Sequence, residues 1–122
     1  MNTKSLGHLG EEQACRYLQD KGYKIIEKNF RNKLGEIDLI AKDGGMTCFI
    51  EVKTRQSLHY GAPYESVHSI KRRKMVQVAL SYLKYKFHTI DVLSRFDVIS
   101  IYQNGQGQAT IEHLINAFDL TF

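Results

Sequence analysis

The sequence has 122 residues, of which 43% are hydrophobic and 25% charged, and this is the size and composition of one soluble globular domain spanning residues 1–122. No apolar run is long enough to span a membrane, and the N-terminus lacks the apolar segment of a signal peptide. Cys15 and Cys48 lie far apart and form neither a disulfide framework nor a metal-type spacing, so a cytoplasmic protein is expected. The net charge of +4 suits a polyanionic partner.

The first predicted element is a helix from about Ser5 to Lys21, which ends at Gly22, a residue type that favours helix C-termini. Helical spacing places five residues on one packed face: Gly7, Glu11, Ala14, Cys15 and Leu18. A carboxylate at Glu11 on this face has two explanations. It is either favoured there by the helix dipole or directed at a functional site, and the residues alone leave both open.

Three strands are expected next. Tyr23 to Phe30 alternates well enough for a first strand and is followed by a polar turn at residues 31–33. Two apolar, β-branched runs, Ile37–Ala41 and Thr47–Val52, then flank Asp43-Gly44-Gly45. This arrangement is a strong signal for a β-hairpin.

The register of this hairpin brings charged residues together. If Gly44-Gly45 forms a two-residue loop, Asp38 lies directly opposite Glu51. The same register places Glu36 opposite Lys53, and a four-residue loop would not change it. Like charges that face each other across strands are destabilising, so two acids among isoleucines indicate a positive group between them. A divalent cation with oxygen ligands is the simplest candidate.

The alternative is an amphipathic hairpin with one solvated face, where such side chains make surface ion pairs of little worth. That reading suits any one of these residues taken alone. The set as a whole favours a site, because Phe49 shares the face of Glu51 and Ile40 shares that of Asp38. This face is therefore at least partly covered, and buried carboxylates need partners or a metal.

The second half of the chain begins with a loop at Gln56–Glu65, where Tyr60 would either stack on a nucleotide or simply pack. A helix should start near Ser66–Ser69 and run to about Lys86. Its expected apolar stripe comprises Met75, Val76, Ala79, Leu80, Leu83 and Phe87.

The first turns of that helix carry four consecutive basic residues, Lys71 to Lys74. Such a run is either a solvated face or, in part, a phosphate-binding surface. Positive charge at a helix N-terminus opposes the helix dipole, a small cost that a phosphate ligand would offset.

Two strands are predicted to end the chain, Arg95–Tyr102 and Gln108–Ile115, joined by a turn at residues 104–107. Asp97 is expected to form an ion pair with Arg95, with a supporting role at the site as the alternative. The five histidines are scattered and receive no role.

The strings Gly35-Glu36-Ile37-Asp38-Leu39-Ile40 and Phe49-Ile50-Glu51-Val52-Lys53-Thr54-Arg55 resemble the restriction-endonuclease-like nuclease superfamily. Its pattern is an acidic residue followed by Glu/Asp-x-Lys on the next strand, although Ile37 replaces the proline that is common before the aspartate. The sequence is most similar to the YraN-type family of small bacterial proteins, which are themselves similar to archaeal Holliday junction resolvases. Gly10-Glu11-Glu12-Gln13-Ala14 and Arg95-Phe96-Asp97 also match, so the resemblance covers most of the chain.

The resemblance implies an α/β fold with an αβββαβ core, in which helices flank a central mixed sheet. It further implies an endonuclease that hydrolyses DNA phosphodiester bonds with Mg²⁺ or Mn²⁺, with branched DNA as one expected substrate and a homodimer as the expected assembly. The alternatives are a nucleic-acid-binding protein without catalysis, a partner in DNA processing, or a metal-free scaffold.

Roles for individual residues follow from the same resemblance. Asp38 and Glu51 would hold the ion, with help from Glu11 and the backbone carbonyl of Val52. Lys53 would act on the attacking water and the transition state. The expected nucleic-acid contacts are Lys71, Lys74, Arg55 and Tyr60.

Overall fold

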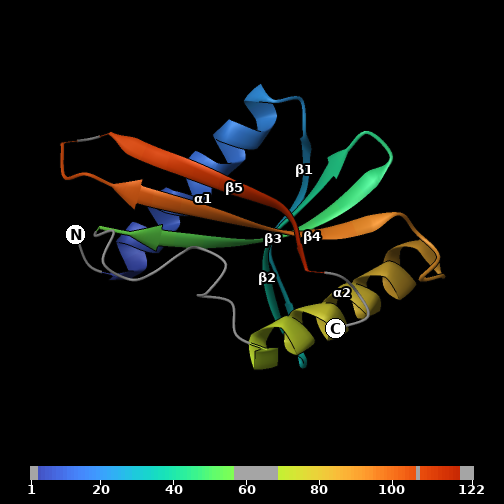
Figure 1. The fold of residues 1–122 in the computed structure, drawn as a ribbon. Coiled ribbons are helices and arrows are strands. Elements are labelled where there is room, and N and C mark those ends of the chain that lie inside the picture. The colour runs from blue at the N-terminus through green and yellow to red at the C-terminus, as the bar shows by residue number, and fades with distance from the viewer. Residues whose placement is uncertain (1–2, 57–68, 107, 119–122) are drawn as a thin grey trace.

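In a computed structural model, the chain folds into a five-stranded sheet with one helix on each face (Figure 1). The structure describes residues 3–56, 69–106 and 108–118. The elements in chain order are α1 (Thr3–Asp20), β1 (Lys24–Asn32), β2 (Gly35–Asp43), β3 (Met46–Arg55), α2 (Ser69–Phe87), β4 (Ser94–Gln103) and β5 (Ala109–Phe118). Neither described helix combines the length and apolarity needed to cross a membrane.

The strands lie in the sheet in the same order as in the chain. β3 and β4 run parallel, whereas the other neighbours are antiparallel. A parallel pair needs a long crossover, and the chain between β3 and β4 contains α2. This α/β arrangement with a mixed sheet confirms the expected restriction-endonuclease-like core, with β5 added at one edge.

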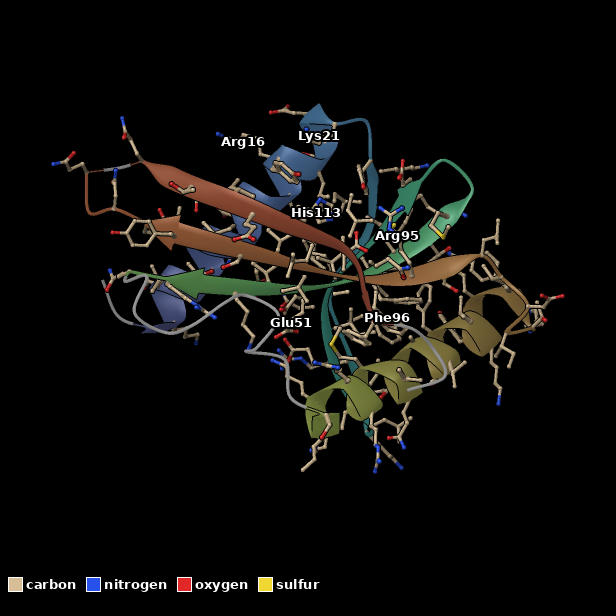
Figure 2. The ribbon with its side chains drawn as sticks, in the orientation of Figure 1. Arg16, Lys21, Glu51, Arg95, Phe96 and His113 are labelled. Carbon is tan, nitrogen blue, oxygen red and sulfur yellow. The ribbon has the colours of Figure 1, made fainter. Side chains whose placement is uncertain are left out.

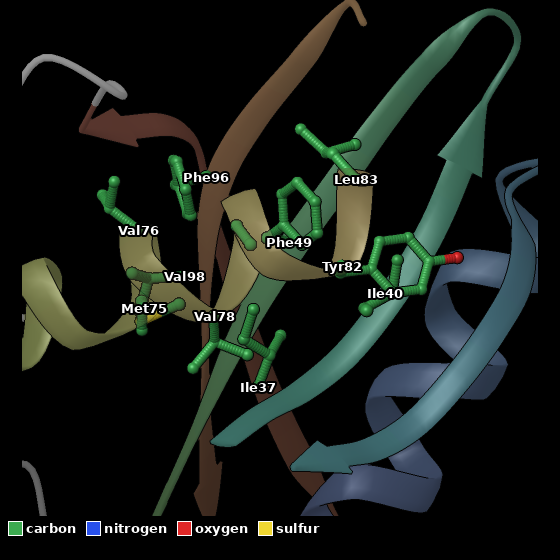
Figure 3. Close-up of a cluster of buried hydrophobic side chains, with 11 residues drawn as sticks. Ile37, Ile40, Phe49, Met75, Val76, Val78, Tyr82, Leu83, Phe96 and Val98 are labelled. Atoms are coloured by element: carbon green, nitrogen blue, oxygen red, sulfur yellow. The ribbon is translucent and has the colours of Figure 1, made fainter. Parts of the chain in front are cut away.

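Each helix packs on its own hydrophobic core. The α1 core includes Leu18, Leu39 and Ile50. The α2 core, drawn in Figure 3, is centred on Phe49, which stacks on Phe96 with ring centroids 5.4 Å apart and meets the edge of Tyr82. Both cores share the central strands β2 and β3, so side chains on these two strands are fixed from both sides.

The buried face of α2 is broader than the expected stripe. Val78 and Tyr82 are almost completely buried, although helical periodicity did not predict them, and Phe87 is 37% exposed. Tyr82 fills the space between Phe30 and Phe49. A helix that lies across a sheet buries a wide arc, and the terminal residue Phe87 has passed beyond the packed region.

Two of the predicted turn and cap sites, Gly22 and Gly44-Gly45, are confirmed, whereas the turn after β1 is shifted. Gly22 has a φ of +93°, and it donates its N–H to Gln19 while Tyr23 donates to Leu18, the two bonds of a Schellman motif. The hairpin turn is Gly44-Gly45. β1 extends two residues past its predicted end, and its turn lies at residues 33–34 instead.

A very close approach fixes α1 against β3. A Cβ added to Gly10 would lie 1.9 Å from Oγ1 of Thr54 and 2.9 Å from its Cβ, so only glycine fits there. One turn earlier, a Cβ on Gly7 would meet nothing within 4 Å. The contact at Gly10 therefore sets the distance between the helix that carries Glu11 and the strand that carries Glu51.

We expect Gly10→Ala to destabilise the protein by about 1–3 kcal/mol, because the added methyl group would force α1 away from β3. Gly7→Ala is the matched control and should be neutral or stabilise by up to about 1 kcal/mol through helix propensity. Urea unfolding measures both. Adding Thr54→Ala should relieve part of the Gly10→Ala penalty, and strictly additive effects would contradict the close contact.

Candidate active site

Asp38 lies at the point where the backbone pairing of β2 with β3 ends. That pairing runs from Asp43–Met46 to Leu39–Ile50, which confirms the predicted register as far as Leu39, the residue next to Asp38. There the carboxylate of Asp38 accepts the N–H of Val52 at 2.8 Å. The side chain of Asp38 thus takes the place of a β2 carbonyl that would otherwise accept the N–H of Val52. Asp38 faces Glu51 across the gap that opens between β2 and β3.

The alternation of β2 breaks at this residue. Ile37 packs in the α2 core whereas Leu39 packs in the α1 core, although residues two apart in a regular strand share a face. On the neighbouring strand β1, Asn29 adopts a φ of +52°, which is uncommon outside glycine. Both irregularities occur next to Asp38 and free its carboxylate from the flat sheet.

Glu51 is 5% exposed and carries two ion pairs. Nζ of Lys53, two residues further on β3, lies 3.3 Å from Oε1 of Glu51. Lys71, in the first turn of α2, binds the same oxygen. Figure 2 shows Glu51 on the side of β3 that faces α2. The strand and the helix thus deliver two ammonium groups to one buried carboxylate.

Glu51 perturbs the carboxyl group of Asp38. Burial and the negative charge of Glu51 raise the pKa of Asp38 to about 8, even though the hydrogen bond from Val52 acts in the other direction. Asp38 forms no ion pair with the described residues, since the nearby ammonium groups bind Glu51. At neutral pH the carboxyl group of Asp38 is therefore largely protonated.

The pKa values of the two lysines that bind Glu51 are shifted in opposite directions. Burial and the neighbouring Lys71 lower the pKa of Lys53, and the attraction of Glu51 only partly compensates. Burial also opposes the charge on Lys71, but its hydrogen bond and ion pair with Glu51 prevail and raise its pKa. Lys53 is thus the ammonium group that gives up its proton more readily.

Asp38, Glu51 and Lys71 line a cavity of about 300 Å³ between β2, β3 and the start of α2. Its lining residues are Gly35, Glu36, Asp38, Glu51, Lys71, Lys74 and Met75. The cavity is large enough for hydrated ions or a phosphate group. It contains both acidic and basic side chains, so it can hold a cation and an anion together.

Glu11 lies near this cavity but does not line it. It borders a neighbouring cavity of about 670 Å³ between α1 and the β1–β2 hairpin, and Glu36 lines both spaces. The charge of Glu11 nevertheless contributes to the raised pKa of Asp38. Within the described ranges, no three His, Cys, Asp or Glu side chains are close enough to hold a metal ion in the observed conformation.

The remaining predicted site residues fall in different places. The backbone N–H of Val52 binds Asp38, Lys74 is exposed at the cavity, and Arg55 is half-buried at the end of β3. Tyr60 lies outside the described residues. The structure therefore brings together Asp38 and Glu51 with their two lysines and places the other candidates around them.

A second polar cluster surrounds the fully buried Asp97, and Figure 2 labels two of its members, Arg95 and His113. Asp97 accepts hydrogen bonds from Arg95 at 3.1 Å, as predicted, and also from His113 at 2.8 Å and the N–H of Asn116 at 2.9 Å. Burial alone would raise the pKa of Asp97, but these donors lower it. His113 also binds the hydroxyl of Tyr17.

This cluster joins α1, β4 and β5 at an irregular point of the β4–β5 pairing. Asp97, His113 and Tyr17 come from three different elements, and no sequence spacing connects them. None of the residues of this cluster lines the cavity of Asp38. The cluster therefore stabilises the sheet rather than adding a group to the site.

Comparison with known proteins identifies the family. The sequence profile described as Uncharacterised protein family UPF0102 matches residues 10–101. The chain belongs to this family. The UPF0102 match includes the two carboxylates and the two lysines that bind Glu51: Asp38, Glu51, Lys53 and Lys71.

Similar UPF0102 proteins occur in several bacteria. One from Geobacter metallireducens is 48% identical over 122 residues, which is 100% of this chain and 98% of that protein. Another from Desulforamulus reducens is 44% identical and covers 96% of this chain and 98% of its own length. One from Caldicellulosiruptor saccharolyticus is 43% identical, and the match covers 97% of this chain and 100% of that protein. The membership of the UPF0102 family thus extends over the full chain.

The raised pKa of Asp38 has a consequence for stability. Because the folded protein retains a proton that the unfolded chain releases above its ordinary pKa of 3.8, the free energy of unfolding should fall as the pH rises from about 4 to about 8. Asp38→Asn removes this dependence. In the presence of EDTA, the variant should gain about 2 kcal/mol or more over the wild type between pH 5 and pH 8.

Urea unfolding at several pH values measures this gain. Asp91→Asn, which removes a carboxylate from an exposed loop, is the control and should not reproduce it. If Asp38→Asn changed stability equally at pH 5 and pH 8, the proposed burial of an ionisable Asp38 would be wrong.

Proposed function

We propose that this protein is a metal-dependent endonuclease that hydrolyses phosphodiester bonds of DNA. The observation that supports the proposal best is the pairing of Asp38 with Glu51 where β2 and β3 separate, with Lys53 bonded to Glu51. This is the arrangement that the superfamily pattern requires of its acidic residues and its lysine. A metal-free scaffold gains nothing from two carboxylates that raise each other's free energy in the core.

The donor groups present fit Mg²⁺ or Mn²⁺. Both ions prefer hard oxygen ligands, and Asp38 and Glu51 offer two carboxylates whose repulsion a divalent charge would remove. The N–H of Val52 points towards β2. In a β-strand the N–H and the C=O of one residue point to the same neighbouring strand, so the carbonyl of Val52 also points towards β2 and is a candidate third ligand. Glu11 would join directly or through water from the adjacent cavity.

Once bound, the ion would lower the pKa of a water molecule and neutralise charge on the phosphate. Lys53 supplies the complementary group. Its lowered pKa suits it to orient this water and accept a proton from it, and its positive form would stabilise charge that develops on the phosphate. Its position two residues after Glu51 keeps it beside the reacting atoms.

Basic residues around the cavity would contact the DNA backbone. Lys71 and Lys74 project from the first turns of α2, and Arg55 ends the strand that carries Glu51. The net charge of +4 favours association with a polyanion. The resemblance to junction resolvases makes four-way DNA a sensible substrate to test first, and paired cuts in such a junction would require two copies of the site in a homodimer.

The cleavage of single-stranded, duplex, flap and four-way DNA with Mn²⁺ tests the function. We expect at least one of these substrates to be cut and Lys53→Ala to reduce the rate by about 10² or more, since it removes the group that acts on the water. Asp38→Asn should have an effect of similar size.

Lys86→Ala, which removes an exposed lysine at the far end of α2, is the control and should cleave like the wild type. Cleavage that persists in Lys53→Ala would indicate a contaminating nuclease. A non-catalytic DNA-binding protein would bind these substrates without cutting them, and Asp38→Asn would then strengthen binding only above about pH 8, where it removes a negative charge from the interface.

Metal binding should depend on pH. Because the ion must displace the proton of Asp38, we expect the apparent affinity for Mn²⁺ to rise up to about tenfold per pH unit from pH 6 and to level off above pH 8. Calorimetric titration at pH 6, 7 and 8 measures this, and thermal stabilisation by Mn²⁺ should follow the same trend. Affinity that is independent of pH, or that survives in Asp38→Asn, would contradict a site at Asp38.

A further inference from the structure

Two ammonium groups share one oxygen of Glu51, and this is more positive charge than one carboxylate needs. Lys53 and Lys71 both bind Oε1, whereas Asp38, on the other side of the gap, accepts a hydrogen bond from Val52 and forms no ion pair with a described side chain. A divalent ion between the carboxylates would satisfy Asp38 as well. It would also compete for the oxygen that the lysines occupy.

The two lysines differ in how easily their side chains can move away from Glu51. Lys53 is on the central strand β3, which is paired with β4 at this position, and its side chain is 26% exposed. Lys71 is in the first turn of α2, and its side chain is 39% exposed at the mouth of the cavity. Its stem can therefore swing into solvent without disturbing the sheet, whereas that of Lys53 is held beside Glu51.

The position of Lys71 is also unfavourable for the helix itself. The first turn of α2 has no acidic residue, and a positive charge there opposes the helix dipole. The ion pair with Glu51 compensates in the observed conformation. A phosphate group bound at the same helix terminus would compensate equally well.

We propose that Lys71 is a displaceable counter-cation, which neutralises Glu51 in the metal-free protein and moves away when a divalent ion binds, so that it then faces the substrate phosphate. The inference rests on the proposed metal site and adds a regulating residue to it. Lys71 lowers the affinity for the ion in free protein, and its ammonium group becomes available beside Lys74 once the ion is present.

The competition predicts that removing Lys71 tightens metal binding. In calorimetric titrations without DNA at pH 8, Lys71→Met should bind Mn²⁺ about tenfold or more tightly than the wild type. Lys74→Met removes one positive charge from the same cavity without breaking a pair to Glu51, so it measures the general electrostatic effect and should change the affinity much less.

The displacement can also be measured in the wild-type protein, which avoids any effect of the substitution on folding. Reductive methylation by formaldehyde and borane, followed by peptide mass spectrometry, reports how accessible each amine is. Saturating Mg²⁺ should increase the modification of Lys71 several-fold relative to EDTA, while Lys74 should change little.

The outcomes separate this inference from the function on which it rests. If the wild type binds Mn²⁺ but Lys71→Met binds it no more tightly than Lys74→Met does, the counter-cation role is wrong and the metal site stands. The same holds if the ion leaves the methylation of Lys71 unchanged. If neither the wild type nor the variants bind Mn²⁺ or Mg²⁺ at millimolar concentration, both the proposed metal site and the role of Lys71 are wrong.

Discussion

The burial of two carboxylates between separating strands is the constraint on which the rest of this structure depends. Asp38 and Glu51 face each other beside two hydrophobic cores, where each ionised group would be costly without a partner. The chain meets this cost with the N–H of Val52 on one side and two lysines on the other. The elements around the cavity are placed to supply these partners.

The two helices contribute to the site in different ways. α1 lies close to β3 because Gly10 has no side chain, and this proximity brings Glu11 near enough to affect Asp38. α2 packs through Phe49 and Tyr82 on the other face, and its first turn delivers Lys71. The close contact at Gly10 and the core around Phe49 thus place charged groups from both helices near the two carboxylates.

Much of the fold could be predicted from the sequence, because local signals determine it. The Gly44-Gly45 turn set the register that aligns Asp38 with Glu51, and Gly22 marked the end of α1. Contacts between distant segments could not be predicted this way. Three such features depend on how helices and strands pack against one another, and sequence spacing does not predict this packing. They are the ion pair between Lys71 and Glu51, the burial of Val78 and Tyr82, and the hydrogen bond from His113 to Asp97.

The parallel pairing of β3 with β4 has a consequence for how the molecule folds. The β2–β3 hairpin can form from neighbouring residues, but β3 acquires its other partner only after the whole crossover with α2 has closed. Such non-local closure is slow, since the chain loses entropy before the contacts form. The carboxylates are therefore enclosed at the same stage as the core, and a partly folded chain would lack the cavity even where its hairpin is complete.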